Sequence, residues 1–130
     1  MNNFIAYHNP SVMGYDATDV ENLRIYTNKV LGNLIGARVW LIAGEGKPRK
    51  FQLRATFIVN NIDASDKPEF LTRVTGKEGQ FLHPMPVLNG ELWFDALKKA
   101  HGNFAFGFQP IDNHIWLAGL RDVLRAATSV

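Results

Sequence analysis

Four consecutive residues, Tyr26, Thr27, Asn28 and Lys29, combine the side chains that could bind a flat ligand. A tyrosine ring offers a stacking face, hydroxyl and amide groups hydrogen-bond to a ligand edge, and the lysine adds positive charge. Trp40 supplies a second large ring. Each residue also has a structural explanation. A tryptophan in a central strand usually belongs to the core, and asparagine tolerates a left-handed turn.

Basic residues form a second group of candidates. Arg38, Lys47, Arg49, Lys50 and Arg54 lie in or near one predicted hairpin, where Glu45 is the only acid. They could form a phosphate-facing edge, or they could be the solvated tip of a hairpin. The whole chain has 14 Lys and Arg against 12 Asp and Glu, a formal charge of +2. This weak excess permits nucleic-acid binding without arguing for it.

The sequence lacks the motifs of common enzyme classes. It has no glycine-rich phosphate loop ending in Lys and Ser or Thr, and no G-x-S-x-G nucleophile elbow. It contains no cysteine, which excludes a thiol nucleophile, a thiolate metal site and a disulfide. Catalysis therefore has no positive support, and a binding function is favoured over an enzymatic one.

Histidines and paired acids give no sign of a metal or an acid–base site. The four histidines are His8, His83, His101 and His114, and no two have the spacing of a metal-binding helix. Asp16 with Asp19 and Asp63 with Asp66 lie in turn or capping contexts. We therefore expect no metal and no cofactor.

The chain is organised around residues 36–60. Residues 36–43 are rich in β-branched and aromatic side chains, which indicates a strand. Glycines and Pro48 then make a turn. Apolar and polar residues alternate from Phe51 to Val59, which predicts a half-buried strand. Ile58 interrupts this alternation, and a second buried face near the strand end would explain it. We expect this hairpin at the centre of a sheet.

Weaker patterns predict the other elements. Strands are expected at residues 4–7, 70–76 and 80–82, the last two joined by a turn at Gly76–Gly79, and residues 24–29 are either extended or a loop that crosses a sheet edge. Thr18 and Glu21 have the form of a capping box that begins a short helical turn. Phe104, Phe106 and Phe108 would share one side of an extended segment and are more typical of core than of a binding site.

Two helices are predicted in the last third of the chain. Residues 91–101 form the first, with Leu92, Trp93, Ala96, Leu97 and Ala100 as its buried stripe. Asp112 or Asn113 caps the second. Its apolar positions are Ile115, Trp116, Ala118, Gly119, Leu120, Val123 and Leu124, whereas Arg121, Asp122 and Arg125 face outward.

Length and composition fit one domain spanning residues 1–130, with 46% hydrophobic residues. The order of elements predicts an α+β fold, a curved antiparallel sheet or open β-barrel with flanking helices. No apolar run approaches the roughly 18 residues of a membrane span, and no signal peptide is visible. A cytoplasmic protein without a membrane partner is therefore expected.

Several motifs together resemble a known superfamily. They are Tyr7-His8-Asn9-Pro10, Met13-Gly14-Tyr15, the run from Tyr26 to Lys29, Gly36-x-Arg38-Val39-Trp40-Leu41-Ile42, and the late segment from Gly102 to Ile111. The pattern resembles the PUA-like superfamily. More narrowly, it is similar to the EVE-like domains that are fused to HNH nucleases in modification-dependent restriction enzymes.

The resemblance implies a β-barrel that accepts a base flipped from duplex DNA, typically a methylated or hydroxymethylated cytosine. By matching position, Tyr26, Thr27, Asn28 and Trp40 would form the base pocket. Lys29, Arg38, Lys47, Arg49 and Lys50 would contact the nucleic-acid backbone. The sequence has no HNH segment, so the domain would recognise the base alone, or with a nuclease that lies on another chain or outside this sequence. The superfamily also contains RNA-binding members.

The leading hypothesis is thus a non-catalytic reader of a modified base in nucleic acid. The alternative is a small enzyme or a small-molecule sensor that uses the same pocket. A third hypothesis is a protein-interaction module with exposed aromatic side chains.

Overall fold

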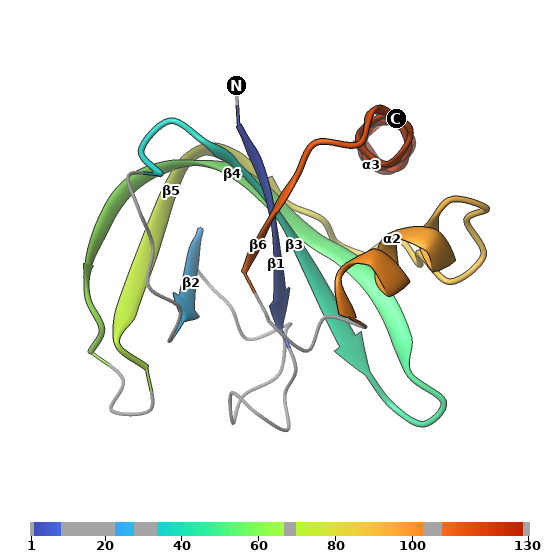
Figure 1. Ribbon diagram of the computed structural model, residues 1–130, viewed down its shortest axis with the longest axis horizontal. Helices are drawn as coiled ribbons and strands as arrows, with labels where there is room; N and C mark the ends of the chain where they lie inside the picture. Colours follow the sequence, from blue (N-terminus) through green and yellow to red (C-terminus); the bar gives the residue numbers. More distant parts are fainter. Residues whose placement is uncertain (1, 9–22, 28–33, 67–69, 103–107, 129–130) are drawn as a thin grey trace.

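Two long antiparallel strands lie at the centre of the protein (Figure 1). The computed structural model describes residues 2–8, 23–27, 34–66, 70–102 and 108–128. Its strands are β1 (Asn3–His8), β2 (Arg24–Thr27), β3 (Arg38–Glu45), β4 (Lys50–Ala64), β5 (Thr72–Phe81) and β6 (Gln109–Ile111), and its helices are α2 (Phe94–Ala100) and α3 (His114–Thr128). The strands form one sheet in the order β2-β5-β4-β3-β1-β6. The predicted hairpin is confirmed as β3 and β4.

The sheet is mixed rather than purely antiparallel. β1 pairs with β3 in parallel, from Asn3 opposite Arg38 to His8 opposite Ala43, whereas every other pairing is antiparallel. Parallel neighbours need a crossover connection, and local sequence patterns do not reveal which strands it joins. The sheet curls into an arch, and its edge strands β2 and β6 do not pair with each other (Figure 1). The predicted α+β class with a curved, open sheet and flanking helices is confirmed.

The central strands are buried on both faces. One hydrophobic cluster lies between the sheet and the two helices and contains Ile5, Trp40, Ile42, Phe51, Leu53, Leu82, Leu88, Phe94, Leu97, Ile111, Leu117, Leu120 and Val123. The other cluster contains Ala6, Ile25, Leu34, Val39, Leu41, Ala55, Phe57, Val59, Val74 and Phe108. The prediction of a half-buried β4 is wrong, because its polar residues Arg54 and Thr56 are buried as well.

The segment predicted as two strands around a turn is one strand, β5, with a bulge. Thr56 faces Gln80 and Ile58 faces Lys77, so Phe57 alone opposes both Glu78 and Gly79. Glu78 has a φ of 50°, and a side chain at Gly79 would overlap Thr56 and Phe57. A bulge admits an extra residue without ending the strand, and it redirects the side chains around it. Glycine and a charged residue thus mark a bulge here rather than a hairpin turn.

The first predicted helix is shorter than expected. α2 buries Phe94 and Leu97, whereas Leu92 is 100% exposed. Of the predicted stripe, Leu97 is buried and Trp93 packs against the core, whereas Leu92, Ala96 and Ala100 are exposed. The predicted N-cap of the second helix, α3, is confirmed at Asn113. The Asn113 side-chain oxygen accepts hydrogen bonds from the backbone N–H groups of Ile115 and Trp116, at 2.9 and 3.1 Å.

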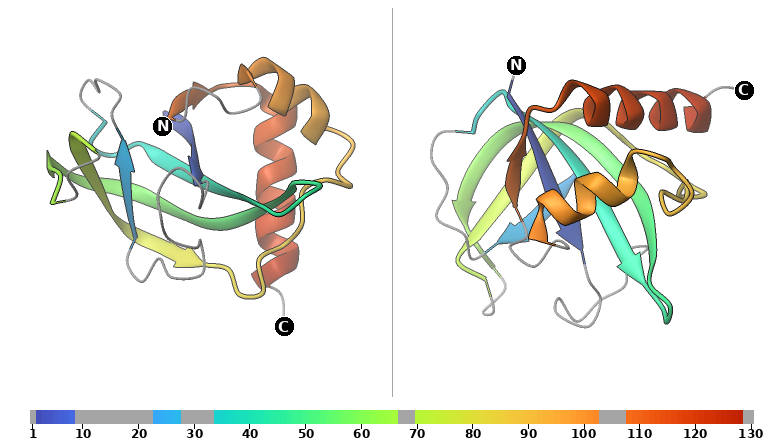
Figure 2. Two further views of the ribbon diagram at one scale, coloured as in Figure 1. Left: turned by 90° about the horizontal axis from the view of Figure 1, so that it is seen from below. Right: turned by 45° about the vertical axis from the view of Figure 1, so that its right-hand side comes forward.

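α3 runs across the direction of the central strands, and α2 lies below it on the same side of the sheet (Figure 2). Gly119 makes this close packing possible, because a Cβ at this position would overlap the Trp93 ring. Helix glycine lowers intrinsic stability, so its place here is explained by the approach of the ring. The outward-facing Ile115 and Ala118 were predicted to be buried and are exposed.

Some predicted features lie outside the described residues. They include the capping box at Thr18 and Glu21, the predicted site residues Asn28 and Lys29, and Phe104 and Phe106. Phe108 is buried in the second cluster, as expected of a core residue. None of the helices in the described part of the chain has the length and apolar composition needed to cross a lipid bilayer.

The contact between Gly119 and Trp93 predicts a position-specific loss of stability. Gly119→Val should lower the free energy of unfolding by about 1–3 kcal/mol, because the added methyl groups displace the ring. Ala118→Val introduces the same side chain on the exposed face of the same helix and should change it by less than about 0.5 kcal/mol. Urea unfolding of both variants measures this, and equal losses would contradict the packing described.

Candidate functional site

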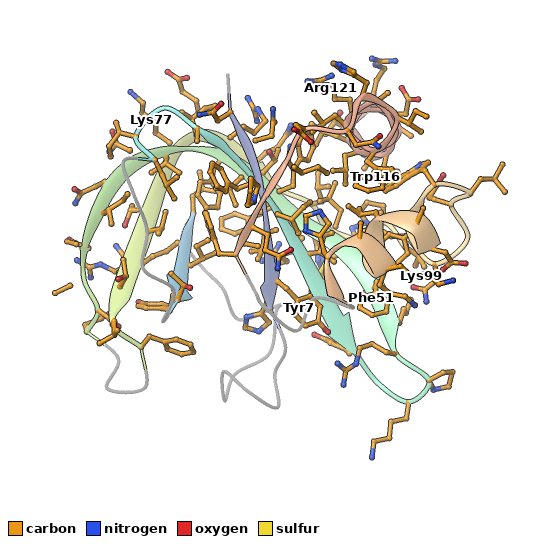
Figure 3. The ribbon with its side chains drawn as sticks, in the orientation of Figure 1. Tyr7, Phe51, Lys77, Lys99, Trp116 and Arg121 are labelled. Carbon is orange, nitrogen blue, oxygen red and sulfur yellow. The ribbon has the colours of Figure 1, made fainter. Side chains whose placement is uncertain are left out.

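A partly open cavity of about 370 Å³ lies between α3, the start of β3, the middle of β4 and the last residues of β5. Its lining residues are Arg38, Trp40, Thr56, Glu78, Gly79, Gln80, Arg121 and Leu124. Figure 3 shows Arg121 on α3 at this upper end of the molecule, with Lys77 of β5 further along the same edge. The cavity thus draws on three adjacent strands and one helix.

The strand register sets the floor of the cavity. Trp40 faces Thr56 across β3 and β4, and Thr56 faces Gln80 across β4 and β5, so the three residues form a row on one face. Trp40 is only 1% exposed, and its indole N–H donates to the side-chain oxygen of Asn3 at 3.1 Å. Trp40 is therefore mainly a core residue, and only a small part of its ring lines the cavity.

Arg38 is held in place by a short chain of hydrogen bonds. Its Nη1 donates to the Thr56 hydroxyl at 3.0 Å, and that hydroxyl donates to the carbonyl of Val39 at 2.9 Å. The guanidinium carbon also lies 5.9 Å from the centre of the Trp40 ring. Burial lowers the pKa of Arg38, the like charge of Arg121 lowers it further, and Glu78 raises it. Arginine remains charged despite such shifts.

Arg121 and Glu78 complete the charged wall. Arg121 and Leu124 are three residues apart and so lie on one face of α3. Glu78 comes from the bulge in β5. Within the described ranges, neither Arg121 nor Glu78 forms a salt bridge, nor does Arg38. Two guanidinium groups that repel each other beside one carboxylate leave a net positive cavity, which suits an anion bound through its oxygens.

The cavity contains one of the four residues predicted for the base pocket. Trp40 lines it, whereas Tyr26 and Thr27 lie on β2, separated from β3 by β5 and β4. Tyr26 packs against Phe70, with ring centres 6.1 Å apart. Its pKa is raised by burial and by its hydrogen bond to Asp66. Asn28 lies outside the described residues.

The predicted backbone-contacting cations divide into two groups. Arg38 lies at the cavity, at the start of β3. Lys47, Arg49 and Lys50 lie in the turn at the other end of β3 and at the start of β4, and all three are exposed. Lys29 lies outside the described residues. One positively charged surface was expected, and the structure shows two at opposite ends of β3.

Sequence reasoning identified two of the eight lining residues, Arg38 and Trp40, and missed the other six: Thr56, Glu78, Gly79, Gln80, Arg121 and Leu124. The pair Glu78-Gly79 inside an extended run was a usable signal, because such pairs also occur at bulges. Nothing in the sequence marked Arg121 as a site residue, because an outward-facing arginine on an amphipathic helix usually contacts only solvent. Among the described residues, no three histidine or acidic side chains come together in a group that could hold a metal ion.

The paired arginines predict binding of a small dianion. Inorganic phosphate at ten times its Kd should stabilise the protein by about 1.4 kcal/mol and raise Tm by about 4 °C. Arg121→Gln should remove this increase. Arg125→Gln is the matched control, because Arg125 lies one turn further along α3 and pairs with Asp122 at 3.4 Å. An equal phosphate effect in parent and Arg121→Gln, compared with chloride at the same ionic strength, would contradict the anion site.

Comparisons with known proteins bear on the fold. No protein-family model and no curated protein matches the sequence. A crystal structure of a mutant ZmASCH protein from Zymomonas mobilis matches 99% of this chain and 100% of its own, with 12% identity and a TM-score of 0.54. The human THYN1 protein, solved in complex with 5-methylcytosine-containing DNA, matches over 95% and 98% of the two chains, with 8% identity and a TM-score of 0.49. The first likeness confirms the predicted PUA-like resemblance at the level of the fold.

Proposed function

We propose that the protein binds nucleic acid and that the cavity beneath α3 receives one nucleotide. The observation that carries the proposal is the pairing of Arg38 and Arg121 at a cavity that also contains a carboxylate and a carboxamide. Its volume of about 370 Å³ lies in the range of small-ligand sites. Phosphate needs the cations, and a base edge needs mixed donors and acceptors. The cavity offers both within one space.

Each group at the cavity has a distinct part in this proposal. The two guanidinium groups bind the phosphate. Glu78 accepts a hydrogen bond from the exocyclic amino group of a cytosine, and the Gln80 carboxamide both donates and accepts at the same edge. Leu124 offers an apolar contact for the base or for a methyl group on it. The side chain of Glu78 is available because the bulge in β5 turns it toward the cavity.

The proposed ligand is duplex DNA with a methylated or hydroxymethylated cytosine flipped out of the stack. Flipping costs a few kcal/mol, which hydrogen bonds to the base edge and contacts with the phosphate must offset. A flipped base brings its own phosphate with it, so Arg38 and Arg121 can act on the same nucleotide as Glu78. In this proposal the domain reads the base, and any cleavage belongs to a nuclease outside this sequence.

A second candidate uses the same groups for a free ligand. A mononucleotide carries a terminal dianionic phosphate, which matches two arginines better than the single charge of a phosphodiester. Under this alternative, the protein is a small-molecule sensor or a small enzyme. Competition separates the two functions: a mononucleotide that binds more tightly than any duplex favours the sensor.

The modified-base proposal predicts different losses for two cavity variants. Duplexes with unmodified, methylated and hydroxymethylated cytosine are titrated at two salt concentrations. Glu78→Ala should lower discrimination between 5-methylcytosine and a thymine at the same position by about 1–3 kcal/mol, because the amino group that thymine lacks loses its acceptor. Arg121→Gln should weaken binding to all three duplexes alike. It should also reduce the salt slope, the slope of log K against the logarithm of the salt concentration, by about 0.9, because one phosphate contact is lost.

Tyr26→Phe and Tyr26→Ala test the site predicted from the sequence in the same titration. If they abolish discrimination between 5-methylcytosine and thymine and Glu78→Ala does not, the base is bound at β2 and the cavity assignment is wrong. Trp40→Ala is a poor probe of binding, because removing a buried tryptophan costs about 3–5 kcal/mol of stability.

A further inference from the structure

A second positively charged surface lies at the end of β3 opposite the cavity. It comprises Lys47, Arg49 and Lys50 of the β3–β4 hairpin and Lys98 and Lys99 of α2, and is called here the hairpin surface. Figure 3 places Lys99 beside Phe51, on the side of the sheet that bears the helices, and places Arg121 at the upper end of the same side. The two surfaces therefore share one side of the molecule.

A pair of aromatic rings holds the hairpin surface together. Arg49 Nη1 donates to the Tyr7 hydroxyl at 3.1 Å, and the rings of Tyr7 and Phe51 lie 6.0 Å apart. Lys98 Nζ lies 5.3 Å from the centre of the Phe51 ring. The Tyr7 ring itself packs on Gly44, where a Cβ would overlap it. Cations from two separate elements are thus fixed around one aromatic pair in the folded protein.

The five cations are available to a ligand. Within the described parts of the chain none of them forms a salt bridge, in contrast to Arg73, which contacts Asp63 at 2.8 Å. The nearby acids along the chain are Glu45, opposite Lys50 in the hairpin, and Asp95, one turn before Lys98. Five cations against two carboxylates leave an excess of three positive charges, which favours a polyanion.

We propose that the hairpin surface binds the phosphate backbone of the same DNA whose flipped nucleotide occupies the cavity. This inference rests on the proposed function and adds the length and direction of the DNA that the protein needs. From Arg38 to Glu45 the chain makes seven steps of roughly 3.3 Å, so the two surfaces are about 23 Å apart. Along B-DNA this distance corresponds to about seven base pairs.

The protein has one hairpin surface, so only one arm of the duplex should reach it. The DNA must extend at least about seven base pairs to one side of the flipped base, and the other side should be dispensable. A uniform, non-directional charge effect would make both arms equivalent. Dependence on a single arm therefore distinguishes a placed contact from general attraction.

Duplex length and lysine removal together test the second surface. The probe is a 5-methylcytosine duplex with arms of about twelve base pairs, and two further duplexes shorten either arm to about four. The test variant is Lys98→Gln with Lys99→Gln, and Lys99→Gln alone changes only an exposed side chain. The control is Ala64→Glu with Leu71→Glu, which lowers the net charge equally at exposed positions near the far end of β4.

Two lost phosphate contacts should lower the salt slope by about 1.8, so the fall in affinity between 50 and 200 mM salt becomes about twelvefold smaller. Shortening one particular arm should weaken binding of the DNA by the parent protein and reduce the parent's salt slope. On that shortened duplex, the parent and the lysine variant should bind equally well. Shortening the other arm should have no such effect, and the control should bind like the parent on every duplex.

Equal salt slopes for parent and lysine variant on the long duplex would overturn the hairpin surface while leaving the cavity proposal intact. Equal effects of the two arms would also overturn it. Conversely, arm-dependent binding without preference for 5-methylcytosine would support the hairpin surface and overturn base recognition. No binding by the parent to any duplex would overturn both.

Discussion

The burial of β3 and β4 on both faces is the constraint on which the rest of the structure depends. Trp40 and Leu53 face the cluster beneath the helices, while Val39 and Ala55 face the opposite cluster. Strands buried on both sides have no free face for a ligand. Polar groups that act on a ligand can therefore lie only where this cover ends, and both positively charged surfaces lie at ends of β3.

The bulge in β5 places a charged side chain, Glu78, at the cavity. In a regular strand beside β4, successive side chains would alternate strictly between the two faces of the sheet, and a bulge adds one residue to this alternation. The bulge places Glu78 and Gly79 opposite Phe57, and the absence of a side chain at Gly79 lets the two strands approach. Bulges often redirect side chains at functional sites. Here the irregularity supplies the carboxylate that faces Arg38 and Arg121.

Local patterns in the sequence predicted the central hairpin, the cap of α3 at Asn113 and the α+β class, because alternation and capping depend on neighbours in the chain. The parallel pairing of β1 with β3 depends on long-range order and was missed. Dependence on long-range packing also explains why only part of the candidate site was predicted. Trp40 was recognisable as an aromatic residue in a strand, whereas Arg121 becomes a cavity residue only once α3 packs across the strands.

The most direct measurement is a map of backbone amide chemical shifts during titration with a duplex carrying one 5-methylcytosine. If the cavity receives the flipped nucleotide, the largest changes should fall at Glu78, Gly79 and Gln80 and around Arg121 on α3. An unmodified duplex of equal length should produce smaller changes there. Largest changes on β2, around Tyr26, would contradict the account and locate the base at the other side of β4 and β5.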